Sequence, residues 1–96
     1  MAEYATEQAT RTILSVLESD YPETLKADGF DDAIIGVAEG WFGQSNHCVI
    51  CYDYEKCAEI LVEQGMSEED AEEYLQFNTT SAYVGEYTPV FLHRWR

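Results

Sequence analysis

Hydrophobic and polar positions follow different periods in successive parts of this chain, and each period predicts an element of secondary structure. In residues 5–19 the apolar side chains recur mostly at helical spacing, which predicts an amphipathic helix. Asp20 and Pro22, followed by Glu23, are typical of a helix start. We therefore expect a short second helix that ends at Gly29.

Two short apolar runs in the next part of the chain predict strands. Residues 33–38 read Ala-Ile-Ile-Gly-Val-Ala, and residues 48–52 read Cys-Val-Ile-Cys-Tyr. Their length and their polar or glycine borders favour strands over helices. The simplest arrangement is a hairpin whose loop is longer than the two-residue optimum. A last strand is expected at residues 90–95, with Pro89 tolerated at its beginning.

Two further helices have the clearest end signals. Asp53 is suited to cap the first of them, and Gly65 supplies its C-terminal stop. Ser67 is suited to cap the second, with an acidic residue three positions later. The residues expected on the buried side of this second helix are Ala71, Tyr74, Leu75 and Phe77.

These elements run in the order helix, helix, strand, strand, helix, helix, strand, which predicts a small α+β domain. We expect a three-stranded, mostly antiparallel sheet packed against helices. The length of 96 residues, without a repeat or a long linker, predicts one globular domain over residues 1–96. A hydrophobic content of 46% is too high for a disordered acidic tail.

Composition adds a strong negative charge to this fold. The chain has 19 Asp and Glu against 5 Lys and Arg, a formal net charge of -14. Such a surface repels phosphate groups and anionic lipids, so neither nucleic acid nor a membrane is expected as a direct ligand. No long apolar run occurs, and Glu3 and Glu7 stand where a signal peptide would carry cations. We therefore expect a cytoplasmic protein.

The acidic residues are concentrated in residues 53–73, which contain nine of them against the single cation Lys56. Glu55, Glu59 and Glu63 follow the i, i+4 spacing and should form a row with steps of about 6 Å along one helix. We expect no lysine to relieve their repulsion. Such a row resembles the phosphates of a nucleic-acid strand, which predicts a DNA mimic that occupies a basic protein groove. The alternative is a solvated helix face without a partner.

The predicted partner surface combines acidic and aromatic side chains. Tyrosine and tryptophan often anchor interfaces, which also makes a homodimer an option. Phe42, Phe91 and Trp95 are instead expected to close the small core. The residues predicted to contact a partner are Asp53, Glu55, Glu59, Glu63, Glu69, Asp70, Glu72, Glu73, Trp41, Tyr83 and Tyr87.

A zinc or thiol site is the alternative chemistry, built from His47, Cys48, Cys51 and Cys57. In an extended strand, positions 48 and 51 point to opposite faces, so the two thiolates would diverge. Small buried hydrophobic residues are therefore the favoured interpretation of these cysteines, and no cofactor is expected.

Catalytic motifs are not evident in the sequence. The two histidines and the serines occur in no nucleophile-elbow pattern, and no glycine-rich phosphate loop is present. Neighbouring carboxylates are explained by the abundance of acidic residues alone. We therefore expect no enzyme activity.

Four segments of the chain resemble small bacteriophage-encoded proteins of unassigned activity. They are residues 32–36, 52–61, 65–69 and 84–91, within a resemblance over about residues 29–92. This resemblance implies an accessory or host-takeover factor in the host cytoplasm, and no active-site residue can be transferred from it.

Charge and resemblance together predict a non-enzymatic acidic protein that blocks a basic protein surface. A nucleic-acid-binding host or defence enzyme would be a natural target. The alternatives are the zinc or thiol protein, and a structural or oligomeric phage protein whose acidic surface is only solvated.

Overall fold

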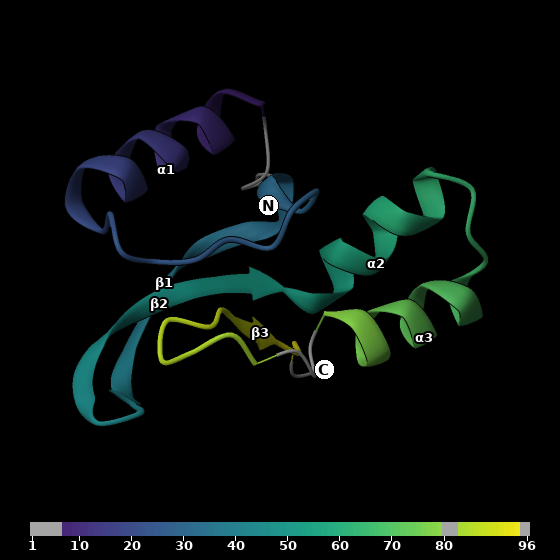
Figure 1. The fold of residues 1–96 in the computed structure, drawn as a ribbon. Coiled ribbons are helices and arrows are strands. Elements are labelled where there is room, and N and C mark those ends of the chain that lie inside the picture. The colour runs from purple at the N-terminus through teal and green to yellow at the C-terminus, as the bar shows by residue number, and fades with distance from the viewer. Residues whose placement is uncertain (1–6, 80–82, 95–96) are drawn as a thin grey trace.

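The computed structural model describes residues 7–79 and 83–94, with side chains from Ile13 onward. It is an α+β structure with three strands, which confirms the predicted class (Figure 1). Residues 5 and 6 of the first predicted helix, and Trp95 of the last predicted strand, lie outside the described residues. The elements are α1 (Glu7–Asp20), the 3-10 turn η1 (Asp31–Ala33), β1 (Ile34–Phe42), β2 (Ser45–Asp53), α2 (Tyr54–Glu63), α3 (Glu68–Asn78) and β3 (Val90–Leu92).

The second predicted helix does not form, so this prediction was wrong. Pro22 disfavours a helical conformation at the residue before it, and α1 ends at Asp20. The chain then turns, and the backbone N–H and the hydroxyl of Thr24 both donate to the carbonyl of Tyr21, at 3.2 and 2.8 Å. Farther along, the N–H of Ala27 donates to the Tyr52 hydroxyl at 2.7 Å, which ties this segment to the sheet instead of to its own helix.

The sheet has the order β1-β2-β3, with β1 antiparallel to β2 and β3 parallel to β2. It is therefore mixed, and the expectation of a mostly antiparallel sheet was wrong for β3. The reason is the connection between β2 and β3, which passes through α2 and α3 and returns the chain in the original direction (Figure 1). Helix-containing crossovers of this kind are the usual link between parallel strands.

In the hairpin between β1 and β2 the strands are longer and the loop is shorter than predicted. Phe42 pairs with Ser45, so the loop contains only Gly43 and Gln44. Gly43 has a φ of 72°, and a glycine with positive φ at the first loop position is typical of a two-residue hairpin turn. The far half of the hairpin mixes exposed and half-buried positions and therefore needs no continuous apolar pattern, which is why the sequence predicted shorter strands.

The core lies between the sheet and the helices. Its largest fully buried side chains are Tyr52, Ile34, Ile50, Leu75, Val49 and Cys57. On α3, Ala71 and Leu75 are buried as predicted, whereas Tyr74 and Phe77 are 41% and 75% exposed. The expectation that the last two are buried was wrong, because α3 packs mainly on the side that carries the i, i+4 pair of Ala71 and Leu75.

Two buried ionisable groups make the fold sensitive to alkali. Burial raises the pKa of Tyr52 from 10.0 to about 12, and burial followed by the nearby Asp53 charge raises that of Cys57 from 9.0 to about 12. The unfolded chain loses these protons first, so their contribution to stability is complete below about pH 9 and is lost as the pH rises toward 12. We expect the free energy of unfolding, measured with urea, to fall over this range.

The contribution of Tyr52 can be isolated with phenylalanine variants. Tyr52→Phe removes the ionisable hydroxyl and should reduce the alkaline slope, although it also lowers stability at neutral pH because the Ala27 N–H loses its acceptor. Tyr83→Phe is the matched control for the loss of one tyrosine hydroxyl, since Tyr83 is 75% exposed and lies outside the core. Equal slopes for the wild type and Tyr52→Phe would contradict the prediction.

Candidate functional site

The start of α2 is organised by Asp53, which is only 2% exposed. Its Oδ1 atom accepts hydrogen bonds from the backbone N–H groups of Glu55 and Lys56, at 3.0 and 3.4 Å. Its Oδ2 atom accepts a hydrogen bond from Nε of Arg94 at 3.0 Å and forms an ion pair with Nη2 of the same side chain at 2.9 Å. The predicted cap is confirmed, but the structure places Asp53 inside the molecule, so it does not belong to the exposed acidic surface.

The connection between α2 and α3 sets these helices side by side. Gly65 follows the end of α2 with a φ of 111°, and Met66 N–H donates to the carbonyl of Leu61 at 3.2 Å. Ser67 then caps α3, where its Oγ accepts the N–H of Asp70 at 3.0 Å. The predicted stop and the second predicted cap are both confirmed. Because the loop is short, α3 returns along α2 (Figure 1).

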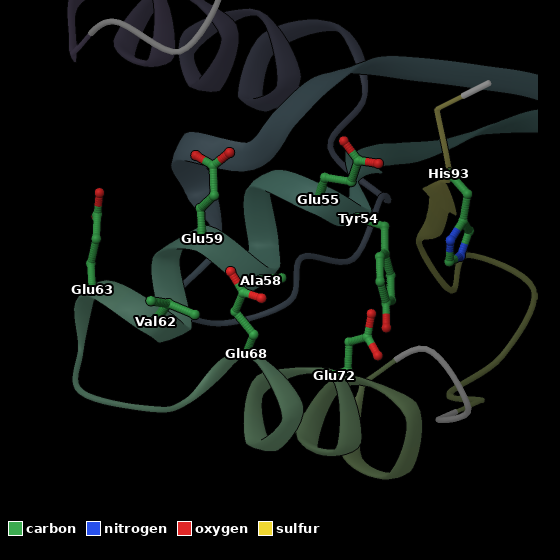
Figure 2. A pocket seen from close by; sticks show the side chains of 9 residues that line it. All are labelled: Tyr54, Glu55, Ala58, Glu59, Val62, Glu63, Glu68, Glu72 and His93. Atoms are coloured by element: carbon green, nitrogen blue, oxygen red, sulfur yellow. The ribbon is translucent and has the colours of Figure 1, made fainter. Parts of the chain in front are cut away.

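A hollow of about 500 Å³ lies along these two helices, and we call it the acidic groove. Five of its lining side chains are carboxylates, three from α2 and two from α3. The groove is lined by Tyr54, Glu55, Ala58, Glu59, Val62, Glu63, Glu68, Glu72 and His93 (Figure 2). The row predicted on α2 is thus joined by a second acidic row on α3.

The acidic groove also offers apolar surface between its carboxylates. Figure 2 shows Glu68 and Glu72 rising from α3 toward α2, with Ala58 and Val62 on the facing side of α2. Val62 is 38% exposed. At one end of the groove, the His93 ring stacks on Tyr54 with 4.1 Å between the ring centroids. The arrangement is therefore an apolar centre within an acidic rim.

One lysine reaches the acidic row on α2, contrary to expectation. Lys56 Nζ lies 3.6 Å from Glu59 Oε1, at the i, i+3 spacing. The Glu59 side chain is 66% exposed, so water and salt screen this pair and its contribution to stability is small. The pair still offsets part of the repulsion between Glu59 and its neighbours in the row.

The other predicted acidic contacts lie elsewhere on α3. Glu69, Asp70 and Glu73 line a separate hollow with Glu72, Gln76 and the exposed Phe77. The prediction omitted Glu68 and His93, which line the acidic groove. A signal for Glu68 was present, since Glu68 and Glu72 share the i, i+4 spacing. No such signal existed for His93, which only the return of β3 brings to Tyr54.

The predicted aromatic contacts have different surroundings. Trp41 and Tyr83 are 73% and 75% exposed, respectively. Tyr87 is half-buried, and its ring centroid lies 4.3 Å from that of His47. Phe91 is also half-buried and stacks on Tyr52 at the core, at 5.3 Å between centroids. Trp41 and Tyr83 therefore remain available for a partner, whereas Tyr87 is engaged within the molecule.

The cysteines are three free thiols, of which Cys57 is fully buried while Cys48 and Cys51 are half-buried. Burial raises the pKa of the Cys51 thiol, and the nearby Asp53 charge raises it further. The same two causes raise the pKa of Cys57 to about 12. Metal binding needs the thiolate form, so both shifts oppose it. Within residues 7–79 and 83–94, no three His, Cys, Asp or Glu side chains are grouped to hold a metal ion.

His47, the fourth residue of the alternative zinc site, belongs to a polar cluster at the hairpin tip. Ser45 Oγ lies 2.8 Å from its Nδ1, and the backbone carbonyl of Glu86 lies 2.8 Å from its Nε2. Glu86 Oε1 lies 3.3 Å from Ser45 Oγ and 3.8 Å from His47 Nδ1. Sequence reasoning missed this cluster because Glu86 comes from a loop far along the chain.

Comparisons with known proteins give no match: no family model fits the chain, and neither a curated protein nor a solved structure is similar to it. The resemblance to phage-encoded proteins therefore stays a prediction. In the described part of the chain, no helix has the length and apolar character needed to span a bilayer.

Proposed function

We propose that the protein acts by binding, and that the acidic groove receives a cationic segment of another protein. The observation that carries this proposal is that five carboxylates from α2 and α3 line one groove whose centre is apolar. Interfaces commonly have an apolar centre and a polar rim, and opposite charge speeds association and selects the partner. Lysine and arginine side chains would pair with the rim, and an apolar side chain between them would contact Ala58 and Val62.

A target that normally binds nucleic acid fits this proposal best. The steps of about 6 Å between successive acidic residues of α2 approximate phosphate spacing, so one basic surface could bind either ligand. The protein would then compete with nucleic acid for that surface. Together with the resemblance to phage-encoded proteins, this competition leads us to propose an anti-defence or host-takeover factor.

Charge reversal on α2 tests this function. The triple variant Glu55→Lys, Glu59→Lys and Glu63→Lys should weaken partner binding by at least about tenfold, since that loss requires only about 1.4 kcal/mol. The measurement is a pull-down from host lysate with the retained proteins identified, followed by titration of each purified partner. Bound partners should be released by duplex DNA and by increasing salt.

A matched control separates the groove from the overall charge. Glu18→Lys, Glu23→Lys and Glu39→Lys change the net charge by the same amount, and all three positions are exposed and lie outside α2 and α3. This control should retain the partners that the groove variant loses. The proposal would be refuted if the control lost them equally, or if the groove variant kept them. Circular dichroism of both variants shows whether the fold is intact.

A further inference from the structure

The hairpin-tip cluster carries an inference independent of the acidic groove, because the hairpin turn lies far from α2 and α3, which form that groove (Figure 1). We propose that Ser45 is a reactive nucleophile that His47 activates as a general base. Its substrates would be neutral aryl or alkyl esters. Serine acquires this reactivity when an adjacent base with a fixed orientation takes its proton.

The hydrogen bonds of His47 assign its neutral tautomer. The Glu86 carbonyl can only accept, so Nε2, at 2.8 Å from it, carries the proton. In the neutral ring Nδ1 then has a free lone pair, and it faces Ser45 Oγ at 2.8 Å. In this tautomer the serine hydroxyl is able to donate to Nδ1, as general-base activation requires. Glu86 Oε1 is a second acceptor for this hydroxyl, but at the longer distance of 3.3 Å.

Packing holds the imidazole in this orientation. Its ring centroid lies 4.3 Å from that of Tyr87 and 5.7 Å from that of Phe42, and the His47 side chain is only 11% exposed. The hairpin turn also packs directly on the loop that supplies Glu86. The approach is so close that a Cβ atom added at Gly43 would lie only 2.8 Å from Glu86 Cβ. The base is thus fixed, as a preorganised site requires.

The surroundings of Ser45 select the substrate class. Ser45 itself is exposed, so an acyl donor can reach its oxygen. The Glu86 carboxylate beside it and the net charge of -14 repel anionic donors. Phe42 and Tyr87 present aromatic surface next to the pair, which favours uncharged apolar groups. Neutral esters meet both conditions.

The reaction proceeds through an acyl-serine. Ser45 Oγ bonds to the acyl carbon, its proton passes to His47 Nδ1, and the ester oxygen leaves with the electron pair of its bond and takes up that proton. Water then attacks the acyl carbon, gives a proton to Nδ1 and releases a carboxylic acid, while Ser45 Oγ leaves and recovers the proton. One ester and one water give one acid and one alcohol.

The test uses p-nitrophenyl acetate as the acyl donor, with p-nitrophenolate release and peptide mass spectrometry as readouts. Ser67 is the internal reference, because it is also exposed but its Oγ is engaged by the Asp70 N–H. Ser45 should be acetylated about a hundredfold faster than Ser67, the lower range of general-base catalysis. His47→Gln should reduce the Ser45 rate by a similar factor, and Ser45→Ala should abolish release above background.

Three results would overturn the proposal: equal acetylation of Ser45 and Ser67, release that persists in Ser45→Ala, or an unchanged Ser45 rate in folded His47→Gln. Persistent release would mean that His47 or a lysine attacks the ester directly. If His47→Gln fails to fold, the ratio between Ser45 and Ser67 in the wild type decides alone. The charge-reversal experiment on the acidic groove is unaffected by any of these results.

Discussion

Replacing Asp53 with alanine is expected to lower the free energy of unfolding by about 2–3 kcal/mol, at or above the top of the range for a helix cap. The buried carboxylate accepts hydrogen bonds from two backbone N–H groups at the start of α2 and from Nε of Arg94, and it pairs with Nη2 of Arg94. All four nitrogens lose this partner in Asp53→Ala. Because Asp53 precedes α2 directly, the loss should also loosen Glu55 at the end of the acidic groove.

Urea unfolding of two comparison variants tests this reasoning. Ser67→Ala removes an exposed cap that accepts one N–H, and it should cost about 1 kcal/mol. Arg94→Ala should cost less than Asp53→Ala, because the Arg94 side chain is 44% exposed and water can replace part of the pair. If Asp53→Ala cost no more than Ser67→Ala, the central role of this carboxylate would be refuted.

Replacing Leu75 with alanine is expected to destabilise the protein by about 3 kcal/mol, within the range for truncating a buried leucine. Leu75 is 0% exposed on α3, in the core cluster that also contains Leu61 of α2. Truncation removes apolar contacts and leaves a cavity in the core that supports α3. Partner binding should weaken as well, since the two acidic rows would lose their fixed separation.

Phe77 provides the matched control on the same helix. It is larger than Leu75 but 75% exposed, so Phe77→Ala should change stability by less than about 0.5 kcal/mol. The comparison requires only thermal or urea unfolding of two single variants. A cost for Phe77→Ala as large as that for Leu75→Ala would show that Phe77 is buried.

Local signals in the sequence predicted much of the fold. The caps Asp53 and Ser67 and the stop at Gly65 were correct because capping depends on residues within one turn of the helix end. The same local reasoning failed at Asp20 and Pro22, where a start-like pattern occurs without a helix. There the hydrogen bond from Ala27 to Tyr52, a residue distant in the chain, replaces helical bonds.

The candidate site was predicted only in part. Glu55, Glu59 and Glu63 line one groove because residues four apart share a helix face. The acidic rim on α3 and the ring of His93 complete this groove through packing. Asp53 shows the opposite case, since its buried pair with Arg94 removes it from the surface. The net charge cannot distinguish an exposed acidic residue from a buried one, because each contributes the same formal charge.

By itself, the sequence determined the α+β class, the strong negative charge and the ends of α2 and α3, all of which depend on composition or on neighbours within one helical turn. Tertiary structure decided the parallel direction of β3, the apolar centre of the acidic groove and the contacts of Ser45 and His47 with Glu86. These features join residues far apart in the chain. Long-range packing brings them together, and no local pattern encodes their separation in space.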